Sequence, residues 1–507
     1  MWEIITTFII YGLFMLAIGV WTYFRTDSIS DYILGGRKLS PWVAGPSAQA
    51  SDFSGWLLLG LPGAVYVAGL SGMWLGISQI FGAYLNWQFI AKRLRLYTEK
   101  SGDSLTVPEF FENRFRDRTH SIRIISALFS LIFYMIYVAS GIVAGAKLFT
   151  ALFDMSYTTG LLLGFAVVFV YTLLGGFLAA SITDMVQGFM MFAALIIAPT
   201  WIIFHNLGGL GGLWEALSGI NPDLLYVTRA VEYNFGDGVF WASAGSASLI
   251  TIIGFMAWGL GFPGQQHIIA RFMGIRSAKD VPKARMIAII LVGFCLWGAI
   301  FAALAGIAYF DQPLADPEKV FLLMIPKLFN PWVAGFLLSA VLAAIMSTMS
   351  SQLVVASSAL AEDFYKPFFH KKASPRELMW IGRIATVIIA GIALWIAFTG
   401  SKSVLGIVAY AWAGFGAVFS PAIIFSVWGK KTTWIGILCG MIAGGGTVIL
   451  WEAYPSISAF FHVPGLYSLI PGFFFSCFVI WIVSMITPKH PEVEAEYEEA
   501  LGLKSAR

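Results

Sequence analysis

The chain has 507 residues, of which 58% are apolar and only 12% charged, with a formal net charge of +3 and a mean hydropathy of +0.80. Soluble domains are about half apolar and about a quarter charged, so this chain has too few polar residues to cover a water-soluble body of its size. The composition excludes a soluble enzyme, a nucleic-acid-binding protein and a disordered scaffold. It predicts an integral membrane protein.

The apolar runs are long and continuous, which favours helices, because barrel strands would alternate in short segments. We predict an all-α integral membrane protein with about 13 transmembrane helices, at 3–24, 41–69, 72–96, 122–152, 157–180, 184–205, 239–269, 284–310, 330–362, 377–399, 403–428, 432–453 and 465–486. Of the 31 Lys and Arg residues, 26 fall on one side of this arrangement and 5 on the other. The positive-inside rule then predicts that the N-terminus is outside and the C-terminus cytoplasmic. We expect a multi-pass protein of the plasma (cell inner) membrane.

The second predicted span contains Asp52, the one ionisable residue far from either end of a span, within the segment 45–56, GPSAQASDFSGW. A carboxylate inside a membrane usually marks an ion or substrate path. Gly and Pro interrupt helices and free backbone carbonyls, as in the broken helices of secondary transporters. The predicted partner of Asp52 is a bound cation or a proton. The alternatives are a protonated Asp52 bonded to a neighbouring helix and close packing of small residues.

The seventh span is interrupted in the same way, at 254–266, GFMAWGLGFPGQQ. Two broken spans five helices apart predict two inverted five-helix repeats, spans 2–6 and 7–11. The predicted divisions of the chain are a first helix and loop (1–40), a first repeat (41–206), a second repeat (207–428), two peripheral helices (429–488) and a cytoplasmic tail (489–507).

The ninth span carries hydroxyl groups within two helical turns, at Ser347, Thr348, Ser350 and Ser351. Hydroxyl and carbonyl oxygens suit a hard cation such as sodium, although Ser and Thr in helices also bond to their own backbone. Asp184 is interpreted either as a helix N-cap together with Thr183 or as a functional acid. His267 is interpreted as structural, and Tyr137 as either a packing residue or a substrate contact.

Five stretches resemble the sodium:solute symporter family: 34–37 (LGGR), 50–57 (ASDFSGWL), 137–146, 258–261 (WGLG) and 338–350. The likeness extends from about residue 5 to residue 485. It implies a LeuT-like core of two inverted repeats with one helix before it and two after. It also implies sodium-coupled import of L-proline by alternating access, without enzyme chemistry.

The resemblance further implies roles for individual residues. The sodium ligands it implies are the carbonyls of Ala50, Phe53 and Ala344 and the hydroxyls of Ser347 and Thr348. The acids linked to coupling are Asp52 and Asp184. The substrate side matches Ser54, Gly55, Trp56, Tyr137 and Trp258, together with Phe262 and Gln266, which replace a tyrosine and a proline of the family's proline carriers. The expected partners are sodium, a small-molecule substrate and the lipid bilayer, with no nucleic acid and no ATP.

Other functions stay open at this point. The same sodium-coupled mechanism with another small amino acid or zwitterion is one alternative, since Phe262 and Gln266 change the polar groups of the site. Proton-coupled uptake through Asp52 is a second. A membrane sensor is a third, against which the short tail argues, and a membrane enzyme lacks the paired carboxylates such chemistry needs.

Overall fold

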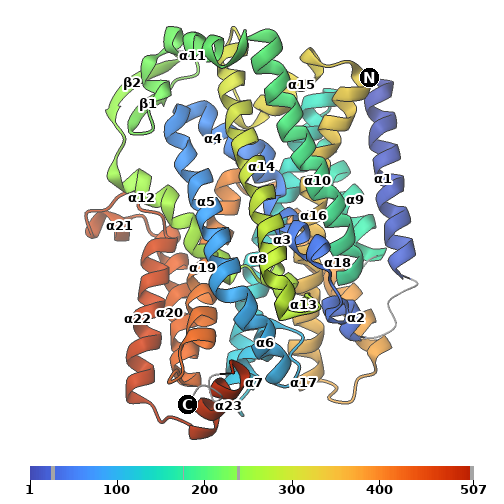
Figure 1. Cartoon of the computed structure of the whole chain (residues 1–507), viewed down its shortest axis with the longest axis vertical. Helices are drawn as coiled ribbons and strands as arrows, with labels where there is room; N and C mark the ends of the chain where they lie inside the picture. The colour runs from blue at the N-terminus through green and yellow to red at the C-terminus, as the bar shows by residue number, and fades with distance from the viewer. Residues whose placement is uncertain (24–28, 175, 237–239, 503–507) are drawn as a thin grey trace.

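The computed structural model describes residues 1–23, 29–174, 176–236 and 240–502, most of them in helices (Figure 1). The first part of the chain forms α1 (Trp2–Tyr23), α2 (Ile29–Leu34), η1 (Gly35–Arg37), α3 (Pro41–Gly55), η2 (Trp56–Gly60), α4 (Leu61–Ala68), η3 (Gly69–Gly72), α5 (Met73–Leu85), η4 (Asn86–Ala91), α6 (Lys92–Lys100), α7 (Val107–Phe115), α8 (Ser121–Phe153), α9 (Tyr157–Leu174), α10 (Phe177–Trp201) and η5 (Ile202–Asn206). The middle part forms α11 (Gly209–Ile220), η6 (Pro222–Leu225), β1 (Arg229–Tyr233), β2 (Trp241–Ser246), α12 (Leu249–Ala257), η7 (Trp258–Gly264), α13 (Gln266–Gly274), η8 (Ala278–Asp280), α14 (Val281–Tyr309), η9 (Pro317–Lys319), α15 (Val320–Leu328) and α16 (Pro331–Ser358). The last part forms η10 (Ala359–Tyr365), α17 (Lys366–Phe368), α18 (Pro375–Thr399), α19 (Val404–Trp428), α20 (Trp434–Ala453), α21 (Ser456–Phe460), α22 (Leu469–Ile486) and α23 (Pro491–Ala500).

Ten helical stretches of the described residues are long and apolar enough to cross a membrane, and two further apolar helices are shorter, at Tyr157–Phe169 and Leu249–Gly264. The count of 13 spans therefore stays a prediction. The predicted start of the seventh span is wrong: Trp241–Ser246 pairs with β1 in an antiparallel hairpin, and the helix begins at Leu249. The predicted start itself, residue 239, lies outside the described residues, as do residue 24 and the end of the tail, 503–507.

The sixth predicted span also begins at the wrong residue. The prediction placed its start at Asp184, whereas α10 begins at Phe177 with Gly176 as its N-cap. Because residues 177–182 are apolar or small and continue the preceding apolar run, hydropathy does not mark this boundary. Asp184 consequently lies two turns inside α10, and its interpretation as an N-cap is wrong.

Helix starts elsewhere follow local signals. α16 begins with Pro331 after Asn330, whose side-chain oxygen accepts the backbone N–H of Val333 at 3.1 Å. α18 begins with a capping box in which Ser374 and Glu377 satisfy each other's backbone N–H groups. Such caps compensate the unpaired N–H groups of a first helical turn, and proline suits the first position because it has no N–H to satisfy.

The core is built around α3, which packs against α10, α14 and α16. α19 packs against η7, α8, α20 and α22. α20 and α22 lie side by side at one edge of the molecule in Figure 1, and α1 lies at the opposite edge. The outer face of α22 exposes aromatic side chains, among them Phe474 and Trp481. This arrangement encloses α3 and leaves apolar surface on the periphery, as a bilayer requires.

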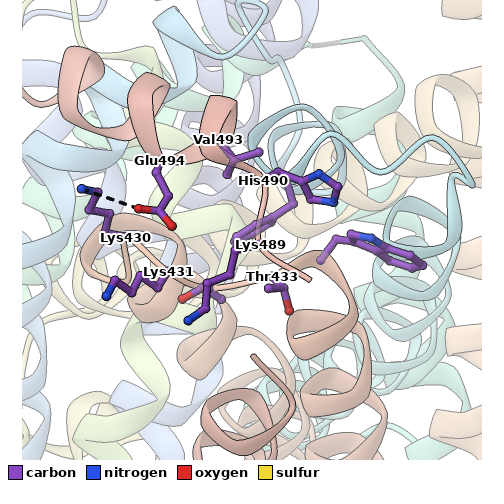
Figure 2. Close-up of a pocket in the computed structure, with 10 residues that line it drawn as sticks. Lys430, Lys431, Thr433, Lys489, His490, Val493 and Glu494 are labelled. Carbon is purple, nitrogen blue, oxygen red and sulfur yellow. Dashed lines mark ion pairs between the residues drawn. The ribbon is translucent and has the colours of Figure 1, made fainter. Parts of the chain in front are cut away.

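The C-terminal helix α23 is held to the body of the protein by charge and by an apolar face. Lys430 contacts Glu498 at 2.8 Å and Glu494 at 3.6 Å, the second pair being drawn in Figure 2. The hydrogen bond with Glu498 raises the pKa of Lys430 above its ordinary value. Arg116 pairs with Glu492 and Glu496 on the same helix. The part of the predicted tail that the structure describes is therefore a docked helix.

Candidate functional site

The break in α3 lies at Ser54, whose backbone (φ 39°, ψ −169°) is outside the helical region. A non-glycine residue with positive φ is strained unless its surroundings fix it, and Ser54 is only 2% exposed. The backbone N–H of Trp56 bonds to the Phe53 carbonyl and the Ser54 hydroxyl instead of continuing the α-helical pattern. The Asp52 carbonyl accepts the indole N–H of Trp56 at 2.9 Å. The break thus turns backbone groups of α3 away from their own helix, as the Gly- and Ser-rich sequence predicts.

Hydroxyl groups of α16 lie directly against this break. Ser347 Oγ donates to the Ala50 carbonyl at 2.8 Å and to the Ala344 carbonyl at 3.1 Å. Thr348 Oγ1 accepts the Ser54 N–H at 2.9 Å and lies 3.5 Å from the Ala50 carbonyl oxygen. All of these residues are buried. Two segments almost 300 positions apart in sequence therefore present carbonyl and hydroxyl oxygens to one small region.

Four of the five predicted sodium ligands are joined by these bonds, namely Ala50, Ala344, Ser347 and Thr348. The carbonyl of the fifth, Phe53, accepts the N–H of Trp56, the first residue of η2. Uncharged carbonyl and hydroxyl oxygens are the donors that hard cations prefer. The donor set is consequently compatible with a sodium ion, and Ser347 and Thr348 can turn their lone pairs toward one by giving up the bond to Ala50.

Asp52 lies two residues before the break and is 1% exposed. Neither carboxylate oxygen has a hydrogen-bond partner among the residues that the structure describes. Tyr137 of α8 is close enough to interact electrostatically with this carboxylate, and its hydroxyl lies near the Ser54 side chain. An ionised carboxylate buried without a partner is costly, so a proton or a cation must compensate it.

Asp184 of α10 belongs to a second buried network, which joins α10 to α3, α13 and α16. Its Oδ2 atom accepts from Arg271 at 2.8 Å, from Ser351 at 3.0 Å and from Ser47 at 3.1 Å. Arg271 also donates to the His267 carbonyl at 2.6 Å, and both charged side chains are fully buried. The predicted seventh span ends at residue 269 and so leaves Arg271 in a loop; this boundary is wrong, since α13 continues to Gly274 and contains Arg271.

Several of the predicted substrate residues lie at the break or contact residues next to it. The rings of Trp56 and Trp258 are 6.4 Å apart, which brings the two broken helices together. Gly55 lies directly against Ala144 of α8, where a Cβ atom would overlap the alanine side chain. Tyr137 packs edge-on against His267 at 6.0 Å. These contacts link α3, α8, η7 and α13 around one buried region.

Phe262 and Gln266 occupy different surroundings. Phe262 packs edge-on against Trp412 of α19 at 5.2 Å. Gln266 donates to Ser130 Oγ of α8 at 2.7 Å, while its amide oxygen has no partner among the described residues. Gln266 also lines a small cavity with Thr106, between the start of α7 and α16. Among the described residues neither side chain forms a ring contact or a hydrogen bond with Trp56 or Trp258, but Trp412 packs against both Phe262 and Trp258.

Sequence reasoning missed three residues at this site. Arg271 was findable, because His267 and Arg271 are four residues apart and so share one face of a helix that continues past the break. Trp412 donates its indole N–H to the Trp258 carbonyl at 2.8 Å, and Tyr467 stacks on the Trp258 ring at 5.5 Å. Nothing in the sequence around these two aromatic residues distinguishes them from the many other aromatics of the apolar spans.

The fold is that of a multi-pass membrane transporter. A solved structure of a Na⁺-coupled sialic acid symporter, in a substrate-bound outward-open state, superposes with a TM-score of 0.77 at 18% identity, covering 96% of this chain and 98% of that one. The closed conformation of Mhp1, a nucleobase-cation-symport-1 family transporter with bound bromovinylhydantoin, gives a TM-score of 0.53 at 12% identity, covering 94% and 99%. At these identities the likeness concerns the fold alone.

Sequence comparison places the chain more narrowly. The profile of the sodium:solute symporter family matches residues 32–444. The high-affinity proline transporter PutP of Bacillus subtilis (strain 168) is 46% identical over 476 residues, which cover 93% of this chain and 96% of that protein. The sodium/proline symporter of Escherichia coli (strain K12) is 43% identical over 511 residues, covering 98% and 97%. The chain belongs to the sodium:solute symporter family.

Proposed function

We propose that this protein is a sodium-coupled symporter that imports L-proline by alternating access. The observation that carries the proposal is the near-complete coverage at 43–46% identity by relatives named as proline transporters. The site supports it independently, because a broken helix faces hydroxyl groups of a second helix and all of these residues are buried. The protein performs transport and not enzyme chemistry.

Sodium is the proposed co-substrate, held by the carbonyls of Ala50, Phe53 and Ala344 and by the hydroxyls of Ser347 and Thr348. The support for this site is the direct bonding of Ser347 and Thr348 to α3. An ion there stabilises the contact of α3 with α16, whereas its release leaves only the packing and the hydrogen bonds of Ser347 and Thr348 with Ala50 and Ser54. Asp52, two residues after Ala50, is proposed to couple this ion to transport.

Asp184 was also predicted to act in sodium coupling. We propose that it does so through its ion pair with Arg271 and not by contact with the ion. The ion pair joins α10 to α13, and α13 is the second half of the broken seventh span. Motion of α13 relative to α10 would separate two buried charges. We propose that the pair holds the inner half of the broken span in place during part of the transport cycle.

The substrate is proposed to bind near Ser54, Gly55, Trp56, Tyr137 and Trp258. An aromatic pair and a buried hydroxyl suit a small zwitterion with an apolar ring. The second candidate is another small amino acid or zwitterion; Phe262 favours it, because it lies on the same broken segment as Trp258 and packs against the same Trp412 ring. Proton coupling through Asp52 is the third, because a proton also compensates its unpartnered carboxylate.

The proposed architecture is two inverted five-helix repeats, 41–206 and 207–428, preceded by one helix and followed by two. About 13 spans place the N-terminus outside and the C-terminus in the cytoplasm of a cell inner membrane. One net charge moving down a potential of about 100 mV supplies about 2.3 kcal/mol, or roughly 50-fold accumulation. A sodium gradient adds to this value.

Uptake into liposomes containing the purified protein tests the function. Radiolabelled L-proline is expected to accumulate with an inward sodium gradient and not with a potassium gradient of the same size. Asp52→Asn is expected to abolish the sodium-driven part, whereas Asp311→Asn, at an exposed loop position, leaves it unchanged. Uptake driven by a pH gradient without sodium would instead establish the proton-coupled alternative. Sodium-driven uptake of another zwitterion that L-proline does not inhibit would show that the substrate is that zwitterion and not L-proline.

A further inference from the structure

A small pocket lies on the side of the molecule that carries α23, where three long apolar helices end (Figure 2). It is formed by the loop between α19 and α20, the segment that follows α22, and α23 itself. α19, α20 and α22 are each long and apolar enough to cross a membrane. Because all three end at this pocket, it lies at one surface of the bilayer, where the phosphate groups of lipids are found.

The boundary between apolar and charged surface runs along the edge of this pocket. Ile486, the last residue of α22, is 77% exposed, and Lys489, three residues later, lines the pocket. Trp481 and Met485 of the same helix are also exposed. Exposed apolar side chains of a membrane-spanning helix contact lipid chains, and Lys side chains near a helix end reach into the headgroup layer. A lipid whose chains lie along α22 therefore has its headgroup at the pocket.

The lining of the pocket carries an excess of positive charge. It includes the ammonium groups of Lys430, Lys431 and Lys489, against one carboxylate, that of Glu494. Lys430 is neutralised by α23, since it pairs with Glu498 at 2.8 Å and with Glu494 at 3.6 Å. Lys431 and Lys489 are both exposed, and neither forms an ion pair or a hydrogen bond with any residue that the structure describes. Two positive charges of the lining are therefore left for an anion.

The two unpaired lysines are directed alike. Figure 2 shows Lys431 and Lys489 extending away from Glu494 on the same side of the pocket. An ammonium group binds a phosphate as a point charge, so two of them can hold one phosphate group between them. This side of the protein is the proposed cytoplasmic side, and basic pockets between membrane helices on that side are typical binding places for anionic headgroups.

We propose that this pocket binds the phosphate group of an anionic phospholipid, held by Lys431 and Lys489, with the acyl chains of the lipid along the exposed face of α22. A soluble phosphate offers the same charge, but it leaves the apolar surface at Trp481, Met485 and Ile486 without a partner. The site does not depend on which solute the protein carries or on the ion that drives transport.

Lipid titration of the purified full chain in detergent tests the site, with bound lipid counted by native mass spectrometry. The probe is dioctanoyl phosphatidylglycerol. Each lysine at a membrane surface contributes about five-fold in affinity, so Lys431→Gln with Lys489→Gln is expected to weaken binding about 25-fold. Lys431→Arg with Lys489→Arg keeps both charges and should bind as the wild type does. Lys371→Gln with Lys372→Gln removes two exposed lysines between α17 and α18, outside the pocket, and should leave the affinity unchanged.

Glu494→Gln gives a result that damage to the fold would not produce. It removes the carboxylate of the lining and leaves Lys430 paired with Glu498 alone. Binding of dioctanoyl phosphatidylglycerol should become about three-fold stronger, because the anion no longer meets a like charge in the pocket. Weaker or unchanged binding in this variant would show that the lipid does not bind beside Glu494.

Two further ligands separate the possible sources of the phosphate. Glycerol 3-phosphate has no acyl chains and should compete only at about 100-fold higher concentration or more, since buried methylene groups supply part of the lipid's affinity. Competition at equal concentration would overturn the lipid assignment in favour of a soluble phosphate. Dioctanoyl phosphatidylcholine carries no net charge and should bind the wild type and the double glutamine variant at Lys431 and Lys489 equally.

Two results would overturn the site as a whole. One is equal affinity for dioctanoyl phosphatidylglycerol in the wild type and in Lys431→Gln with Lys489→Gln. The other is an equal loss of affinity in Lys371→Gln with Lys372→Gln, which would mean that the lipid responds to the total charge of this side of the protein and not to the pocket.

Discussion

Neutralising the buried pair Asp184–Arg271 one partner at a time should destabilise the protein strongly. Each side chain is fully buried, with 2.8 Å between Arg271 Nη2 and Asp184 Oδ2. Asp184→Asn leaves a guanidinium with only hydroxyl and carbonyl partners, and Arg271→Gln leaves a carboxylate with only hydroxyl donors from Ser47 and Ser351. Removing one partner of a buried pair costs about 3–5 kcal/mol, because the other charge is left without compensation.

The double variant distinguishes a true pair from two independent residues. Removing both charges leaves no orphan charge, so the double variant should be more stable than the sum of the single losses implies, by about 2 kcal/mol or more. The assay is the loss of the monodisperse chromatographic peak of purified protein after heating. Asp280→Asn is the matched control, because Asp280 pairs with the exposed Arg276 at 2.6 Å and such pairs contribute about 0–1 kcal/mol.

Additive losses in the double variant would refute the reasoning, since they would mean that the two charges do not stabilise each other. The same variants separate a structural role from a role in binding sodium. If Asp184 acts by holding Arg271, the double variant should regain uptake relative to either single variant, with the sodium concentration for half-maximal uptake unchanged. If that concentration rises about ten-fold in the double variant as well, Asp184 contacts the ion.

Two further substitutions test the contacts of the broken helix. Thr348→Val removes the hydroxyl that bonds to the Ser54 N–H. The sodium concentration for half-maximal uptake should rise about ten-fold, or about 1.4 kcal/mol, whereas Thr348→Ser should stay near the wild type. Equal sodium dependence in the two variants would contradict the assignment of Thr348 as a sodium ligand. Gly55→Ala places a Cβ atom into the Ala144 side chain and should cost about 1–3 kcal/mol of stability and most of the uptake. Gly12→Ala on α1, where nothing lies within 4 Å, is the control and should change neither. Unchanged stability and uptake in Gly55→Ala would show that α3 and α8 are not closely packed.

The sequence by itself determined the class of the protein and the positions of the helix breaks. Composition identifies a membrane protein because polar surface must cover a soluble body, and that requirement does not depend on how helices are arranged. The break near Ser54 was predictable, since Gly, Pro and a buried acid act on the backbone within a few residues. The hydroxyl groups at Ser347 and Thr348 were predictable as a set, because they lie close together on one helix and their grouping is visible in the sequence.

Only the tertiary structure decided which of these groups meet. Ser347 bonds to Ala50 across almost 300 positions, and Asp184 pairs with Arg271 instead of capping a helix. The sequence placed Arg271 in a loop because hydropathy treats a charged residue as exposed unless a partner is known, and the partner lies on another helix. Tyr467 reaches Trp258 from a loop outside both predicted repeats. These contacts depend on how whole helices pack, which local patterns of residues do not contain.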